Sequence, residues 1–289
     1  MAYSVLVTDT STAVGKVLEE ELTSSDIQVL SLNLSDSTAE NVCDIQAKLT
    51  QCNPDMVINT YGWSDKGERL LDLPVVPVAQ TISQYCSDNN KVLMQLSNYR
   101  VFSGTKSGFL ESDEIEPRDS CGTVFAELEK IVAEVERHIL LRLSWVIGAT
   151  GENLMTTISE SLWRGNQADI HAERRGAPVG HCDIARIVTA VVKQVSCGSQ
   201  NWGIFHYSSA DVCTEEELAE EISERLKSEC DTQGMINDIS DAEAKPYSAA
   251  LGYRRLMDNF GIQPRTWRQG LNLELTTWLA QRSEHKIKE

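Results

Sequence analysis

The sequence predicts an α/β fold built on a doubly wound parallel sheet, with a smaller C-terminal α/β part. Short apolar runs rich in β-branched residues alternate with amphipathic stretches as far as Gly148. Such alternation is typical of parallel strands joined by right-handed crossovers. Beyond Gly148 the rhythm changes. We therefore expect a first domain at residues 1–148 and a smaller part at 149–289 that is interleaved with the first.

The first strand is expected at residues 3–8 (YSVLVT), and the helix after it has apolar residues at helical spacing over 14–22. The same reading places further strands at 27–32, 56–59, 91–96 and 139–144, and further helices at 38–52, 75–88 and 121–138.

The second part is expected to hold helices at 153–164 and 181–195 and a strand at 203–207. Thr214 and Glu217 have the spacing of a capping box, which predicts the start of another helix. Residues 231–247 are dominated by Asp, Gly, Ser and Ala, so this segment is expected to be less regular.

Composition excludes several classes of function. The formal net charge of −17 would repel a polyanion, so nucleic-acid binding is excluded. The eight Cys form no CxxC pair and the five His are scattered, which argues against a metal site. The sequence has no cleavable signal and no long apolar run. We therefore expect reduced thiols in a cytoplasmic protein that does not enter membranes.

Several segments together point to a known family. They read PDMVIN at 54–59, SNYRVF at 97–102, RLSWV at 142–146, RGAPVG at 175–180 and FGIQPRTWR at 260–268. In this order and spacing they resemble the dTDP-4-dehydrorhamnose reductase family of extended short-chain dehydrogenases, over nearly the whole chain. The resemblance implies a Rossmann-like fold. The activity that it implies is NAD(P)H-dependent reduction of a 4-keto sugar nucleotide.

The catalytic positions that the resemblance implies are all changed. In the family, a Tyr gives a proton to the carbonyl oxygen, a Lys four residues later lowers the pKa of that Tyr, and a Ser or Thr holds the carbonyl. The corresponding residues here are Cys121, Phe125 and Asn98. Phe125 offers no cation to a thiolate or to a nicotinamide ribose. No catalytic residue is expected, and the alternative is different chemistry through a reactive Cys121.

The cofactor loop is changed as well. The family pattern G-x-x-G-x-x-G falls on Asp9, Thr12 and Gly15, and a carboxylate at Asp9 would repel a pyrophosphate. Hydroxyls before the helix still offer donors to an anion, so NAD(P) binding is expected to be weakened rather than lost. The cofactor-binding residues expected are Thr10, Ser11, Thr12, Gly15 and Asn59.

The ends of the second and third strands would meet the rest of the dinucleotide. Residues 33–36 include no Arg or Lys for a 2′-phosphate, so a preference for NADPH is not supported. Tyr61 and Trp63 are interpreted either as core residues or as stacking partners of a base.

The sugar-nucleotide side is better preserved. Arg174 and Arg175 match a loop that faces the nucleotide in the family, and guanidinium groups pair with phosphate in a bidentate manner. Asn153 and Ser248 match further positions of the same site. The alternative for the arginine pair is a surface loop that only balances charge.

These observations lead to competing hypotheses. The first is a non-catalytic member, or pseudoenzyme, that binds a sugar nucleotide or dinucleotide as a regulatory or binding subunit, with a protein partner or as a homodimer. The family includes a regulatory subunit of methionine adenosyltransferase, which implies that the scaffold can serve a partner. The second is an active NAD(P)H-dependent reductase of a 4-keto sugar nucleotide with atypical residues. The third is a scaffold that binds no nucleotide.

Overall fold

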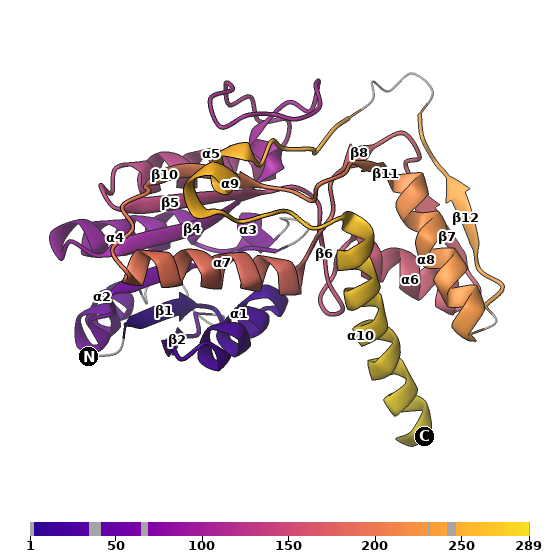
Figure 1. Cartoon of the computed structure of the whole chain (residues 1–289), viewed down its shortest axis with the longest axis horizontal. Helices are drawn as coiled ribbons and strands as arrows, with labels where there is room; N and C mark the ends of the chain where they lie inside the picture. The colour runs from indigo at the N-terminus through magenta and orange to yellow at the C-terminus, as the bar shows by residue number, and fades with distance from the viewer. Residues whose placement is uncertain (1–2, 35–41, 65–68, 231, 242–246, 289) are drawn as a thin grey trace.

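The computed structural model describes the chain apart from residues 1–2, 35–41, 65–68, 231, 242–246 and 289 (Figure 1). Its centre is a six-stranded sheet in the order β10-β5-β4-β3-β1-β2, in which all neighbours are parallel. The strands are β1 (Ser4–Thr8), β2 (Gln28–Leu32), β3 (Met56–Asn59), β4 (Val92–Asn98), β5 (His138–Leu143) and β10 (Gly203–Tyr207). The expected doubly wound parallel sheet is confirmed.

Helices cover the sheet on two sides (Figure 1). One layer is formed by α1 and α7, which pack against each other, and the other by α2, α4 and α5, in which α4 lies between its two neighbours. The bounds are α1 (Ala13–Ser24), α7 (His181–Ser196), α2 (Val42–Cys52), α4 (Val75–Asp88) and α5 (Ser120–Ala133). Two short helical segments, α3 (Arg69–Asp72) and η2 (Tyr99–Val101), follow the ends of β3 and β4. The chain order reverses at β1, which places a switch point between β1 and β3.

A second hydrophobic core lies at the end of the sheet, among α6, α8 and α10. It includes Trp267 and Trp278 of α10, together with Leu218 and Ile222 of α8. The elements of this part are α6 (Leu154–Trp163), β7 (Gln167–Ile170), β8 (Arg175–Gly176), β11 (Cys213–Thr214), α8 (Glu215–Cys230), β12 (Met235–Asp238) and α10 (Trp267–Lys288). Between the two cores lie β6 (Val146–Ile147) and β9 (Val179–Gly180), whereas α9 (Arg254–Phe260) packs on β10 and belongs to the main core. The domain boundary at residue 148 stays a prediction, although α7 and β10 return to the first sheet after it.

Some expectations need correction. The helix expected at 121–138 ends at Ala133, and part of 231–247 is a strand, because Met235–Asp238 pairs in parallel with β7. The sequence did not indicate this strand, since its side chains are partly or fully exposed and do not alternate. The helix α10 was missed too, and residues 231 and 242–246 lie outside the described part. The capping box is confirmed, with Thr214 N donating to Glu217 Oε2 at 2.7 Å and Glu217 N donating to Thr214 Oγ1 at 3.0 Å.

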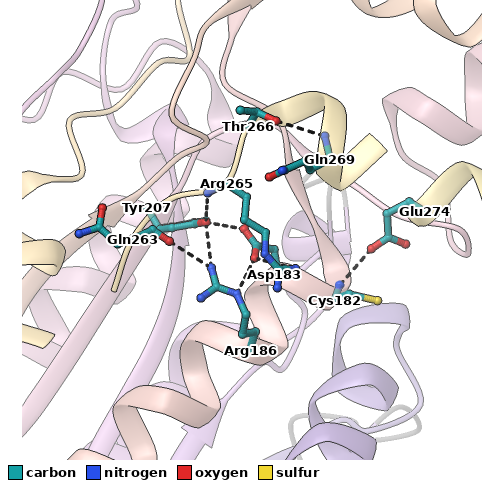
Figure 2. Close-up of polar contacts among 9 residues, drawn as sticks. All are labelled: Cys182, Asp183, Arg186, Tyr207, Gln263, Arg265, Thr266, Gln269 and Glu274. Atoms are coloured by element: carbon teal, nitrogen blue, oxygen red, sulfur yellow. Dashed lines mark hydrogen bonds and ion pairs between the residues drawn. The ribbon is translucent and has the colours of Figure 1, made fainter. Parts of the chain in front are cut away.

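The start of α7 ties the C-terminal segment to the sheet (Figure 2). Asp183 accepts hydrogen bonds from the Tyr207 hydroxyl of β10 and from Arg186 Nε, the latter at 2.8 Å. Arg265 Nη1 lies 3.7 Å from Asp183 Oδ1. Burial, followed by the charge of Asp183, raises the pKa of Tyr207. The segment at 260–268 therefore has a structural role in closing the fold.

Glu274 of α10 accepts a hydrogen bond from a free backbone N–H group at the N-terminus of α7. Its side chain is buried, and its two oxygens accept hydrogen bonds from Cys182 N at 3.0 Å and Ala149 N at 2.9 Å. The contact to Cys182 is drawn in Figure 2. A carboxylate at a helix N-terminus is favoured by the free N–H groups and by the helix dipole.

A buried ion pair joins α5 to β5. Arg142 donates from Nε to Glu129 Oε1 at 2.8 Å and from Nη2 to Oε2 at 2.6 Å, and both side chains are at most 3% exposed. Ser97 Oγ of β4 donates to the same Glu129 Oε1 at 2.5 Å. The remaining Arg142 Nη1 lies 3.2 Å from His206 Nε2. The pair is thus bidentate and has further partners on both neighbouring strands.

We expect Glu129→Gln to lower the free energy of unfolding by about 3 to 5 kcal/mol, because it leaves the Arg142 charge buried without its counter-ion. Urea denaturation followed by circular dichroism measures the change. The matched control is Glu229→Gln, whose partner Arg225 is at the surface, and it should change stability by less than about 1 kcal/mol. A loss in Glu129→Gln no larger than in the control would contradict the expectation.

His206 should make stability depend on pH. Its Nδ1 lies 3.0 Å from Phe109 O, and burial, followed by the charge of Arg142, lowers its pKa to about 3. Between the unfolded pKa of about 6.5 and the folded value, only the unfolded chain binds the proton, so stability falls as the pH falls. From pH 7 to 5.5 we expect this residue to contribute a loss of about 1 kcal/mol. Urea titrations of the wild type and His206→Gln should diverge by this amount. Parallel curves would refute it.

Candidate functional site

The carboxyl ends of β1, β3 and β4 carry a buried polar network. Thr8 Oγ1 donates to Asn59 Oδ1 at 2.8 Å, and Asn59 Nδ2 donates to Gln95 Oε1 at 2.7 Å. All three side chains are at most 3% exposed. The Asn59 amide, which the sequence suggested for cofactor binding, is therefore engaged at both ends within the sheet.

The loop between β1 and α1 is held by its own atoms. Thr12 caps α1, because its Oγ1 accepts from Gly15 N at 3.1 Å, and the same hydroxyl donates to Asp9 O at 3.0 Å. A Cβ at Gly15 would lie 2.3 Å from Asp9 O, so only glycine fits there. The last glycine of the family pattern thus keeps its structural role.

Asp9 stands where the family pattern has its first glycine. Its φ of 61° is left-handed, a conformation that glycine adopts without strain and Asp tolerates better than most residues. The side chain is fully buried, and Oδ1 accepts from Ser11 Oγ at 2.5 Å. Oδ2 is buried without a hydrogen-bond partner within the described residues. The loop therefore contains a buried carboxylate with an unsatisfied acceptor.

The hydroxyls expected to meet a phosphate all donate within the protein. Thr10 Oγ1 donates to Asn33 Oδ1 at 2.9 Å, at the end of β2. The hydroxyls of Ser11 and Thr12 both donate to Asp9, as described above. Of the expected cofactor residues, Thr10, Ser11, Thr12 and Gly15 do lie together, but in this conformation none of their side chains offers a hydroxyl proton to a ligand.

The two aromatic residues after β3 belong to the core. Tyr61 is 1% exposed and Trp63 is 2% exposed, and both pack in the main hydrophobic cluster. The interpretation as core residues is therefore confirmed, and stacking on a base is not available to side chains buried in this way. Residues 35–36, which would face an adenosine ribose, lie outside the described part of the chain.

Of the three positions at which the resemblance implies catalytic residues, Asn98 ends β4, while Cys121 and Phe125 lie on α5. Asp119 caps this helix by accepting from Gly122 N at 2.8 Å. A Cβ on Gly122 would lie 2.1 Å from Arg100 O, so the first turn of α5 touches the turn after Asn98. Cys121 is 7% exposed, and Phe125 is 1% exposed and packed in the main core. Asn98 Oδ1 accepts from Arg100 N at 3.1 Å.

The expected sugar-nucleotide residues divide into two groups. Asn153 is fully buried and caps α6, with Oδ1 accepting from Thr156 N at 3.1 Å and Nδ2 donating to Gly148 O at 3.0 Å. Its side chain is therefore fully used by the fold. Arg174 and Arg175 are exposed, and the backbone of Arg175 forms an isolated β-bridge with Ser248. Ser248 Oγ accepts from Ala250 N at 3.3 Å.

A further group of residues lies beside these positions, and Arg174 is the only member that the sequence analysis proposed for binding. We call it the arginine–tyrosine cluster, and its members are Tyr99, Arg100, Arg118, Arg174 and Tyr247. The rings of Tyr99 and Tyr247 lie 5.9 Å apart, and Arg118 Cζ lies 4.8 Å from the centre of the Tyr247 ring. Burial raises the pKa of Tyr99, while the charges of Arg100 and Arg174 act in the opposite direction. The signal was present, since Tyr99 and Arg100 directly follow Asn98.

Comparison with known proteins identifies the family. The model of the RmlD substrate binding domain matches residues 3–279. The chain belongs to the RmlD family.

Curated relatives align with this chain over nearly their whole length. A dTDP-4-dehydrorhamnose reductase of Aggregatibacter actinomycetemcomitans is 23% identical, over 92% of this chain and 96% of the relative. The spore coat polysaccharide biosynthesis protein SpsK of Bacillus subtilis is also 23% identical, over 92% and 95%.

Solved structures show the same fold. A dTDP-4-dehydrorhamnose reductase of Clostridium acetobutylicum has a TM-score of 0.81 at 22% identity, over 94% of this chain and 98% of that one. The enzyme of Bacillus anthracis in complex with NADP has a TM-score of 0.81 at 21% identity, over 96% and 98%. The resemblance and the Rossmann-like fold inferred from the sequence are thus confirmed, while catalytic degeneracy stays a prediction.

The described residues of this RmlD-family chain contain neither a candidate metal site nor a candidate membrane span. Within the described residues, no group of three or more His, Cys, Asp or Glu is arranged to hold a metal ion. In the same part of the chain, no helix combines the length and the apolar character that crossing a membrane requires.

We expect Asp9→Gly to strengthen NADPH binding by at least about tenfold, because it removes a buried negative charge at the phosphate end of α1 and releases the Ser11 hydroxyl. Fluorescence titration of NADPH measures the affinity. The matched control is Asp26→Gly, which removes an exposed Asp with a φ of 60° and should leave the affinity unchanged. Equal affinity of wild type and Asp9→Gly would exclude this role of Asp9.

Proposed function

We propose that this RmlD-family protein binds a nucleotide sugar without reducing it and acts as a binding or regulatory subunit. The observation that carries the proposal is Phe125. Its ring fills the core at the position where the family resemblance implies a lysine. One helical turn separates it from Cys121, so the pair keeps its place on the helix but has no cation and no phenol.

The expected loss of rate is large. General acid catalysis contributes about 10² to 10⁴ in rate, and here the phenol, its cationic neighbour and the hydroxyl at position 98 are replaced together. The Cys121 side chain is mostly buried, which limits its contact with a substrate. Asn98 has an amide N–H to donate, which orients a carbonyl but does not protonate it.

The dinucleotide side supports the same proposal. The three hydroxyls of Thr10, Ser11 and Thr12 donate within the protein, and Asp9 adds a buried carboxylate to the loop. A pyrophosphate there would have to displace these bonds and approach a negative charge. Binding of NAD(P) is therefore weakened in this proposal, although the N-terminus of α1 remains.

The nucleotide-sugar side supports binding. Arg174 and Arg175 are exposed, and neither forms an ion pair with another described residue. Guanidinium groups bind phosphate through two parallel hydrogen bonds, so the two arginines suit the pyrophosphate of a nucleotide sugar.

The second candidate is an active NAD(P)H-dependent reductase of a 4-keto sugar nucleotide. The comparisons favour it over the non-catalytic hypothesis, because several relatives are named dTDP-4-dehydrorhamnose reductases, and one of the solved reductases holds NADP. None of these relatives indicates a loss of activity. The residues of this chain therefore support the non-catalytic candidate, whereas the names of its relatives support the reductase. A cytoplasmic location and a protein partner or homodimer stay predictions from the sequence.

An assay separates the two candidates. We expect no oxidation of NADPH or NADH above background with a dTDP-4-keto-6-deoxy sugar, because the proton donor and its cation are replaced. Absorbance at the nicotinamide band measures turnover. Robust turnover that Cys121→Ala abolishes would overturn the proposal and establish the reductase.

A binding arm completes the test. We expect dTDP-glucose to raise the melting temperature of the wild type, and the Arg174→Gln/Arg175→Gln variant to lose this shift. The control pair Arg164→Gln/Arg254→Gln removes two exposed arginines elsewhere and should keep it. No shift with any nucleotide would favour a scaffold without a ligand.

A further inference from the structure

The arginine–tyrosine cluster concentrates positive charge in a strongly acidic protein. Arg100, Arg118 and Arg174 come from three segments of the chain, and all of them act electrostatically on the tyrosines between them. The chain as a whole has a formal net charge of −17. A local excess of guanidinium groups against this background indicates a site for an anion.

The acids near the cluster offset only part of this charge. Asp119 is bonded to Arg100 Nη1 at 2.6 Å and also accepts the N–H of Gly122 at 2.8 Å. Glu215 faces Arg174 from the start of α8, and burial raises its pKa. Arg118 has no ion pair among the described residues and lies over the Tyr247 ring.

Two buried donors in the same place have no acceptor. Asn98 is 1% exposed, and because its Oδ1 accepts from Arg100 N, its Nδ2 is the group that remains. Within the described residues, neither Asn98 Nδ2 nor the buried Arg100 Nε has a hydrogen-bond partner. Buried polar groups are nearly always satisfied, so two neighbouring orphan donors call for an acceptor.

We propose that Asn98 together with Arg100 and Arg118 of the arginine–tyrosine cluster binds a carboxylate on the sugar, so that the ligand is a nucleotide hexuronate. This inference rests on the proposed function, because it takes Arg174 and Arg175 to hold the pyrophosphate. Asn98 stands where the resemblance places the residue that meets the sugar carbonyl. A carboxylate there accepts from Asn98 Nδ2 and from Arg100 Nε, two atoms that can only donate.

The tyrosines complete the site. Tyr247 is fixed in place, since a Cβ on Gly104 would lie 1.9 Å from its ring, and its backbone O accepts from Arg175 N at 2.8 Å. The Tyr99 and Tyr247 rings, 5.9 Å apart and tilted by 55°, present apolar surface beside the guanidinium groups. This combination suits a sugar ring, which has an apolar face and a charged edge when it bears a carboxylate.

The test compares ligands that differ only at C6 of the sugar. Calorimetric titration measures the affinity of the full chain for UDP-glucuronate and UDP-glucose, and for the corresponding thymidine compounds. We expect each glucuronate to bind at least about tenfold more tightly than its glucose counterpart, as charge-assisted hydrogen bonds exceed neutral ones.

The sharpest variant is Asn98→Asp. It keeps the oxygen that accepts from Arg100 N and replaces the orphan donor by a second oxygen of nearly equal size. The preference for glucuronate should be lost, with binding of the glucose compound changed by less than about threefold. Arg118→Gln should reduce the preference in part, and Arg254→Gln, at an exposed site on α9, should leave it intact.

The outcomes distinguish this inference from the function on which it rests. If glucose and glucuronate compounds bind equally well, the carboxylate site is refuted and the nucleotide-sugar function stands. If none of the compounds binds, the proposed function fails and the carboxylate site fails with it. A preference that survives Asn98→Asp overturns the assignment of the Asn98 amide.

Discussion

The arrangement of the site depends on one buried ion pair, between Arg142 of β5 and Glu129 of α5. Two charges leave water only when their geometry is good and the remaining donors and acceptors are satisfied. Ser97 of β4 and His206 of β10 supply those further bonds, so three neighbouring strands and one helix share the same two charges. The second half of α5 is thereby held against β4 and β5. The start of the helix touches the turn after Asn98, because Gly122 lies against Arg100 O.

The fold tolerates the changed residues because it does not depend on the groups that were replaced. Phe125 is packed in the main core, and its ring adds buried apolar surface there. Gly15 and Gly122 keep their places because a Cβ at either would collide with backbone oxygen. The backbone therefore requires both glycines, whereas Phe125 stands at a position where only the predicted chemistry of the family would require another residue.

The sequence was sufficient to predict the main sheet and its helices, because the spacing of apolar residues and the turn residues within each segment indicate its secondary structure. It was not sufficient to predict which hydrogen-bond partners the polar side chains have. The hydroxyl of Thr10 is taken by Asn33, and the Asn59 amide by Thr8 and Gln95, all across strands that are distant in sequence. Asn153 was assigned to the sugar-nucleotide site, but its side chain caps α6 in a capping box with Thr156. The strand β12 gave no signal, because its exposed side chains show no alternation and only its backbone pairs with β7.

The charge distribution joins these points. A chain with a net charge of −17 repels anions over most of its surface, so an anionic ligand gains its attraction only where arginines gather. They gather where η2, the start of α5, β8 and the segment that bridges to β8 at Ser248 meet. The dinucleotide end has instead acquired a buried carboxylate at Asp9, fully excluded from solvent. The two ends of the family's binding region thus have opposite electrostatic character. A ligand with its negative charge on the sugar side suits this field, whereas a dinucleotide must place its pyrophosphate against Asp9.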